Sequence, residues 1–140
     1  MNKSGPVIII EDDADDREIL QLIFKKLNYK NEILFFEDGE AALAYLNNPT
    51  ALPFIILSDI NMPRLNGFDL KRKLQTDAAL QVKCIPYLFF STAINQQAVI
   101  NAYSLSAQGF FIKESNLKEL ENTIKLVMDY WQKCAAPNNF

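Results

Sequence analysis

The most informative absence in this sequence of 140 residues is histidine, which does not occur at all. Its absence excludes histidine general bases, histidine metal ligands and phosphohistidine chemistry within the chain. Cysteine is scarce as well, and the two present, Cys84 and Cys134, are too few for a disulfide framework. We therefore expect a reducing, cytoplasmic setting.

Excess positive charge and long apolar runs are also missing. The formal net charge is −3, and the one basic cluster, Lys71-Arg72-Lys73, falls in a helical pattern where we expect a solvated face. A nonspecific nucleic-acid binder would carry a basic patch, so nucleic acid is not an expected partner. No leader with an apolar stretch is visible and no apolar run approaches membrane-spanning length, so we expect no membrane either.

Short apolar runs alternate with amphipathic helical segments. The expected strands are 7–10, 33–36, 54–57, 87–90 and 110–112. The expected helices are 14–27, 39–46, 68–75, 96–105 and a last one carrying an apolar stripe over 117–131. A polar connection is expected after residue 75. This alternation predicts an α/β fold: one five-stranded parallel sheet, order 2-1-3-4-5, with helices on both faces, which is the flavodoxin-like, doubly wound arrangement.

Polar side chains follow four of these strands directly. They belong to the segments Glu11-Asp12-Asp13, Ser58-Asp59, Ser91-Thr92-Ala93 and Lys113. In an open parallel sheet, ligands bind beyond the carboxyl ends of the strands. The four segments are therefore expected to converge on one site.

The acids after the first and third strands predict a cation site. Glu11, Asp12 and Asp59 would share one crevice, where carboxylates about 4 Å apart repel by roughly 4 kcal/mol per pair. Holding them ionised requires a cation or a raised pKa, and oxygen ligands with open water positions favour Mg²⁺. The neighbouring acids Asp13, Asp15 and Asp16 are expected only to cap or decorate the following helix.

A carboxylate beside Mg²⁺ can attack phosphorus and form an acyl phosphate. The charge that develops on the phosphoryl oxygens needs electrophilic partners. Lys113 can supply an ammonium and Ser91 a hydroxyl donor. The residues therefore point to phosphoryl chemistry.

These residues carry a resemblance to the receiver domain of bacterial two-component response regulators, in its stand-alone form. The resemblance covers residues 6–133, with 1–5 and 134–140 expected as short flexible termini. The motifs that carry it are Val7-Ile8-Ile9-Ile10-Glu11-Asp12-Asp13, Ser58-Asp59-Ile60-Asn61-Met62-Pro63 with Gly67, Ser91-Thr92-Ala93, and Gly109-Phe110-Phe111-Ile112-Lys113.

The resemblance implies a metal site and a role for each residue in it. Asp59 would be the phosphoacceptor and a metal ligand. Asp12 would touch Mg²⁺ directly, Glu11 would act through water, and Asn61 would add its backbone carbonyl. Lys113 would contact the phosphoryl group.

The resemblance also implies a switch. Ser91, with Thr92 as second choice, would be the hydroxyl residue drawn toward the phosphoryl group, and Phe110 the aromatic residue that moves inward after it. A plain core role for Phe110 is the alternative. Two departures from the family are visible: Phe110 replaces the common tyrosine, and Glu114 replaces the proline that usually follows the lysine. We expect a trans peptide bond before Glu114.

The implied function is that of a signalling switch in a phosphorelay. A histidine kinase or a histidine phosphotransfer protein would donate the phosphoryl group, the acyl phosphate would hydrolyse slowly, and an unidentified protein would read the changed face. Weak self-association through that face is a further expectation. The alternatives are a Mg²⁺-dependent phosphatase with an aspartate nucleophile, against which Asn61 stands where the second acid would be, and a receiver-like interaction module that needs no phosphorylation.

Overall fold

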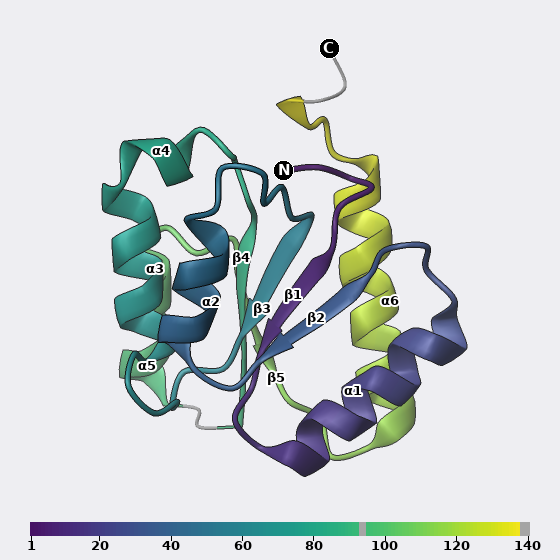
Figure 1. Ribbon diagram of the computed structural model, residues 1–140. Coiled ribbons are helices and arrows are strands. Elements are labelled where there is room, and N and C mark those ends of the chain that lie inside the picture. Colours follow the sequence, from purple (N-terminus) through teal and green to yellow (C-terminus); the bar gives the residue numbers. More distant parts are fainter. Residues whose placement is uncertain (93–94, 138–140) are drawn as a thin grey trace.

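The computed structural model describes residues 1–92 and 95–137 and shows one sheet between two layers of helices (Figure 1). All neighbouring strands are parallel, in the order β2-β1-β3-β4-β5, which confirms the predicted fold class and strand order. The elements are β1 (Val7–Ile10), α1 (Ala14–Leu27), β2 (Ile33–Phe36), α2 (Gly39–Leu46), β3 (Ile55–Ser58), α3 (Gly67–Thr76), α4 (Ala78–Gln81), β4 (Tyr87–Ser91), α5 (Gln96–Ser104), β5 (Gly109–Ile112) and α6 (Leu117–Lys133).

Strand alternation divides the core into two layers. Val7 and Ile9 of β1 face α1 and α6, whereas Ile8 and Ile10 face the layer that contains α2, α3 and α5 (Figure 1). All four side chains are at most 2% exposed. A strand buried on both faces is continuously apolar, which is why these short runs are readable in the sequence.

The strand ends extend slightly beyond the apolar runs. β3 includes Ser58, which is paired in register with Ile10, and β4 includes Ser91, which is paired with Ile112. The short helix α4 is not among the predicted elements. Its first backbone N–H groups, those of Ala79 and Leu80, donate to the side chain of Asp77, so a capped single turn stands where a polar connection is predicted.

The expectation of a solvated basic face on α3 is wrong for one residue. Lys71 is only 9% exposed, whereas Arg72 and Lys73 are exposed. The cause is the helical period, which turns Lys71 inward over the ring of Tyr87 in β4.

Hydrogen bonds tie the amino-terminal segment to the domain. Asn31 donates to the carbonyls of Lys3 and Gly5, and Gln132 also donates to that of Lys3. These bonds join the segment to Asn31, just before β2, and to the end of α6. The flexibility expected for residues 1–5 stays a prediction. Of the carboxyl-terminal segment, residues 138–140 lie outside the described residues, as does Ala93 of the third motif. In the described ranges, no helix is both long and apolar enough to cross a bilayer.

Candidate functional site

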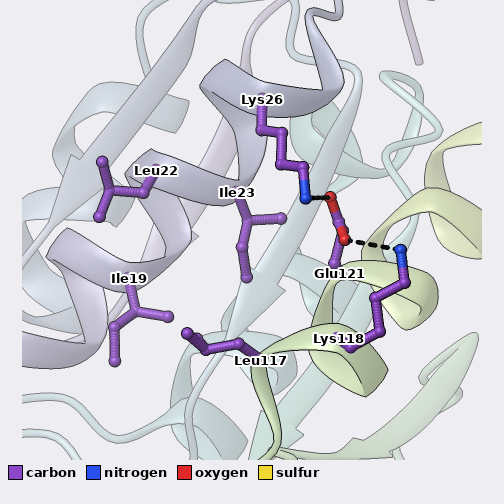
Figure 2. Close-up of a pocket in the computed structure, with 7 residues that line it drawn as sticks. All are labelled: Ile19, Leu22, Ile23, Lys26, Leu117, Lys118 and Glu121. Carbon is purple, nitrogen blue, oxygen red and sulfur yellow. Dashed lines mark hydrogen bonds and ion pairs between the residues drawn. The ribbon is translucent and has the colours of Figure 1, made fainter.

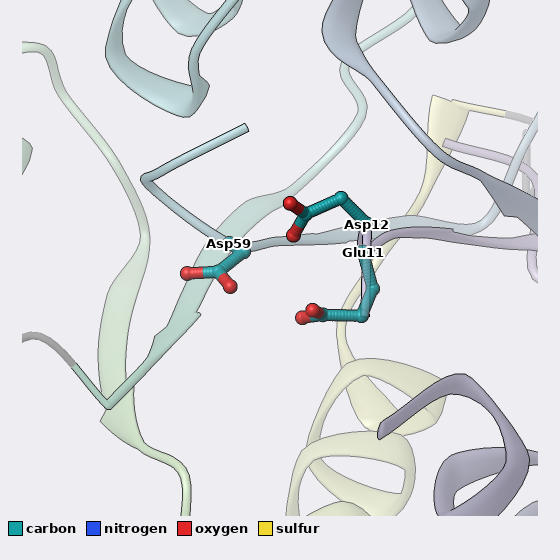
Figure 3. A group of neighbouring side chains, drawn as sticks. All are labelled: Glu11, Asp12 and Asp59. Carbon is teal, nitrogen blue, oxygen red and sulfur yellow. The ribbon is translucent and has the colours of Figure 1, made fainter. Parts of the chain in front are cut away.

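The sheet register brings the acids of two distant segments together. Ile10 pairs with Ser58, so the residues that follow them leave neighbouring strands at the same level. The backbone N–H of Asp59 donates to the Ile10 carbonyl at 3.0 Å, which continues the ladder to the base of the site. Glu11, Asp12 and Asp59 each offer a carboxylate oxygen, and these oxygens lie within 4.8 Å of one another (Figure 3). The predicted acidic crevice therefore exists.

Lys113 lies at the same end of the sheet and completes the site. Its ammonium contacts Glu11 Oε2 and lies 3.1 Å from Asp59 Oδ2. The Lys113 backbone N–H donates to the Ser91 carbonyl at 3.1 Å, and this bond fixes where the side chain leaves β5. With 11% of its side chain exposed, Lys113 is placed to meet an anion that reaches Asp59.

Asp59 is fixed by backbone contacts on its other side. The Ile60 N–H donates to Asp59 Oδ1 at 2.7 Å, and the Ser58 hydroxyl donates to the Asp59 carbonyl oxygen. Gly67 is needed here because a Cβ at that position would lie 2.2 Å from the Asp59 carbonyl oxygen. The start of α3 thus passes directly beside the backbone carbonyl of Asp59.

Burial and charge shift the two groups at the centre of the site. Burial raises the pKa of Glu11 to about 7, and the Lys113 ammonium counteracts that shift without cancelling it. Burial alone would lower the pKa of Lys113, but its hydrogen bond to Glu11 and the charge of Asp59 raise that pKa above its ordinary value. The site is therefore rich in negative charge that one lysine only partly balances.

The donor set fits a divalent metal ion. The three carboxylates supply only oxygen ligands, which hard divalent cations prefer. Asp12 is exposed and Asp59 half-buried, so a cation can enter from solvent while keeping bound water. Asn61 is also exposed and follows Asp59 by two residues.

The residues predicted for the switch lie on β4, in the bend that follows it, and on β5. Ser91 ends β4 and is 1% exposed, whereas Thr92 is exposed in the following bend. Phe110 is half-buried and packs on Phe89, with ring centroids 6.0 Å apart. Phe111 points to the opposite face of the sheet and stacks on Phe90, as the strand period predicts.

The chain follows its expected path after Lys113. The peptide bond before Glu114 is trans, because the described residues contain no cis peptide bond. Asn116 then caps α6, accepting from the Glu119 N–H at 3.1 Å. The loop between them carries no proline.

Asp16 belongs to the site, although the sequence indicates only a helix-decorating role. Its Oδ2 lies 3.2 Å from Lys113 Nζ. Asp13 does cap α1, accepting from the Asp15 and Asp16 N–H groups. The signal that could have found Asp16 is its place in the first turn of α1, since helical side chains point back toward the amino terminus and thus over the end of β1.

An apolar groove runs between α1 and α6 (Figure 2). Its volume is about 360 Å³, and its walls include Ile19, Ile23 and the outward-lying Leu22 and Leu117, each of the latter pair 61% exposed. At one end Lys26 lies 3.0 Å from Glu121. Both helices begin just after residues of the acidic site, so the groove lies beside its mouth.

A doubly wound sheet with an acidic metal crevice and a lysine at its carboxyl edge defines a class of signalling domain. The family model of the response regulator receiver domain matches residues 7–125. The chain belongs to that family.

Response regulators are among the proteins to which the chain is similar. The chain is 28% identical to response regulator Rcp1 of Synechocystis sp. (strain ATCC 27184 / PCC 6803 / Kazusa), over 93% of this chain and 90% of that protein. Its fold is similar to that of the phosphorylated cyanobacterial phytochrome response regulator RcpA, with a TM-score of 0.84 at 26% identity over 96% of this chain and 98% of that one. The Mn²⁺-bound form of Rcp1 gives a TM-score of 0.82 at 25% identity, over 96% and 99% of the two chains.

Proposed function

We propose that Asp59 accepts a phosphoryl group from a phosphohistidine on a partner protein. The observation that carries this proposal is the position of the Asp59 carboxylate, which lies beside the acidic oxygens of Glu11 and Asp12 and 3.1 Å from the ammonium of Lys113. In the transfer, a carboxylate oxygen bonds to phosphorus, the P–N bond breaks, and the imidazole leaves with the electron pair. The phosphohistidine belongs to the partner, since this chain contains no histidine.

In this step the acidic residues would bind the cation, and the lysine would bind the phosphoryl group. Asp12 and Asp59, with the Asn61 backbone carbonyl and with Glu11 acting through water, would hold Mg²⁺, which supplies positive charge to the phosphoryl oxygens when bound. Lys113 would donate to a phosphoryl oxygen from the other side, because it already faces Asp59. The manganese form of Rcp1 supports a divalent cation in this fold; Mg²⁺ itself is our proposal.

Mass spectrometry with a small phosphodonor tests the acceptor. Incubation with Mg²⁺ and phosphoramidate should add one phosphoryl group to the wild-type protein and none to Asp59→Asn. Omission of Mg²⁺ should remove the adduct from the wild type. An adduct that survives in Asp59→Asn would contradict the assignment.

Phosphorylation of the site would change the positions of Ser91 and Phe110, and a partner protein would recognise that change. Ser91 is buried at the end of β4, and Phe110 is half-buried against Phe89, so movement of one frees space for the other. Beryllofluoride with Mg²⁺ should shift the amide signals of both residues in NMR spectra. Unchanged spectra would instead favour an interaction module that works without phosphorylation.

Weak self-association is part of the same proposal. The face that we expect to change on phosphorylation includes α5 and β5. Exposed apolar side chains lie on both elements, namely Ile100 and Tyr103 on α5 and Ile112 on β5, and each is about half exposed or more. Sedimentation velocity should show a larger average mass after beryllofluoride treatment. An average mass that stays at the monomer value would rule out this contact.

The partner that carries the phosphohistidine is proposed to dock on the groove between α1 and α6. A histidine kinase or a histidine phosphotransfer protein must bring its imidazole to the Asp59 carboxylate, and this groove is the apolar surface beside that site. Leu22 and Leu117 then supply the apolar contact, and the Lys26–Glu121 pair supplies polar contacts at the rim.

An exposed-leucine pair tests this docking surface. Leu22→Lys should slow transfer from a phosphorylated histidine phosphotransfer protein about tenfold, while phosphorylation by phosphoramidate stays unchanged. The control Leu126→Lys changes a leucine that is also exposed, 65% against 61% for Leu22, but lies outside the groove. Equal transfer rates for the two variants would refute the proposed surface.

The broader role is that of a switch with slow autodephosphorylation. Asn61 stands where an aspartate-nucleophile phosphatase would place its second acid, so turnover of small phosphate esters is not expected. Release of phosphate from such esters over many cycles would contradict this role. A receiver domain over residues 6–133, a cytoplasmic location and an unidentified downstream protein target stay predictions.

A further inference from the structure

A second cavity opens at the opposite end of the sheet from the acidic site. Its volume is about 510 Å³, within the range of small-molecule sites. Its lining residues come from α3, α4 and the end of α6, and from the amino ends of β4 and β5. Its walls include the side chains of Lys71, Leu74, Gln75, Leu80, Tyr87 and Trp131.

Lys71 is a buried cation in the wall of this cavity. It is 9% exposed, and its ammonium lies 5.9 Å from the centroid of the Tyr87 ring. Across residues 1–92 and 95–137, no carboxylate forms an ion pair with this ammonium and no acceptor forms a hydrogen bond with it. Lysines are rarely buried without a partner, because desolvation of the ammonium is costly. Burial accordingly lowers the pKa of Lys71.

Gln75 adds an unsatisfied acceptor one helical turn further along α3. Its Oε1 is buried and has no hydrogen-bond donor among the described residues. Residues four apart lie on the same helix face, so Lys71 and Gln75 both border the cavity. A buried acceptor without a donor costs about 1–3 kcal/mol, and a ligand that supplies the donor recovers this energy.

The other residues that line the cavity indicate which class of ligand would fit. Leu74, Leu80 and Trp131 give apolar surface, and among residues 1–92 and 95–137 none that lines the cavity is acidic. An anion can therefore approach Lys71 without repulsion from a neighbouring carboxylate.

We propose that this cavity binds a small organic carboxylate that has an apolar body and one hydrogen-bond donor. The carboxylate pairs with the Lys71 ammonium, the donor meets Gln75 Oε1, and the body packs between Leu74, Leu80 and Trp131. The site is independent of phosphorylation at Asp59, because it lies at the other end of the strands.

The probe is 4-hydroxyphenylacetate, which has each of these three features. The chain contains one tryptophan, so the Trp131 indole N–H gives a single cross-peak in ¹H–¹⁵N spectra. That peak should shift saturably below about 10 mM ligand. The neutral analogue 4-hydroxyphenylethanol should bind about tenfold more weakly, and phenylacetate, which lacks the donor, about fivefold more weakly.

Variants of α3 separate a binding site from mere packing. Lys71→Met should weaken binding of 4-hydroxyphenylacetate about tenfold, whereas Lys71→Arg and the exposed control Lys73→Met should stay within about threefold. Thermal melts establish that each variant folds. The proposal is overturned if no saturable shift occurs, or if the charged and neutral probes bind equally. These measurements use unphosphorylated protein, so their outcome does not depend on whether Asp59 is the phosphoacceptor.

Discussion

At the scale of single residues, the chemistry of the site depends on which carboxylates the Lys113 ammonium contacts. Lys113 faces Glu11, Asp16 and Asp59, and only Asp59 is the proposed phosphoacceptor. Glu11 is buried and fixed, whereas the Asp16 side chain is 38% exposed and can move away. Asp16 therefore competes with an incoming phosphoryl group for the same hydrogen-bond donor.

Substitution of Asp16 tests this competition. Asp16→Asn should raise the rate of phosphorylation by phosphoramidate about two- to threefold, since an exposed ion pair contributes little energy. The neighbouring Asp15→Asn is the control, because Asp15 is exposed and forms no ion pair with Lys113 in the described part of the chain. A slower reaction for Asp16→Asn would mean that Asp16 orients Lys113.

At the scale of elements, the loop from β3 to α3 determines where Asp59 lies. The chain turns after Ile60, and the Gly67 N–H donates back to the Ile60 carbonyl at 2.9 Å. Tyr87 of β4 supports the same turn, since its hydroxyl donates to the Gly67 carbonyl. The backbone can pass so close to Asp59 only without a side chain at position 67.

Two glycine substitutions test this close approach. Gly67→Ala should destabilise the fold by about 1–3 kcal/mol and slow phosphorylation, because its Cβ would press on the Asp59 carbonyl. Gly109→Ala should cost less, since its nearest neighbour is the end of the Leu88 side chain at 3.1 Å rather than backbone at 2.2 Å. Denaturant unfolding measures both free energies; equal losses would refute the special role of Gly67.

The arrangement of helices and strands also determines which features can be predicted from the sequence. The strands, their order and the meeting of Glu11, Asp12 and Asp59 follow from apolar runs and from parallel-sheet topology, which require no side-chain detail. The Lys113–Asp16 contact and the inward turn of Lys71 depend on the rotation of α1 and α3 about their axes. The single turn α4 is too short to produce a helical period.

At the scale of the whole molecule, the two ends of the sheet differ in charge. The carboxyl ends of the strands carry the carboxylates of Glu11, Asp12 and Asp59, which call for a cation. The amino ends carry a cavity that has a buried lysine and no acid among its described lining residues, and for which we propose an anionic ligand. A parallel sheet separates these ends by the length of its strands, so the two proposed sites do not overlap.

The central property of the molecule is a fold that brings Glu11, Asp12 and Asp59 together beside Lys113, and we propose that these acids share one divalent ion. Substoichiometric Mn²⁺, a paramagnetic substitute for Mg²⁺, tests this directly through the broadening of amide signals in ¹H–¹⁵N spectra. We predict broadening around residues 11–13, 59–61 and 113 together, and its loss in Asp12→Asn. Broadening at only one of these segments, or equal broadening in the variant, would contradict a shared metal site.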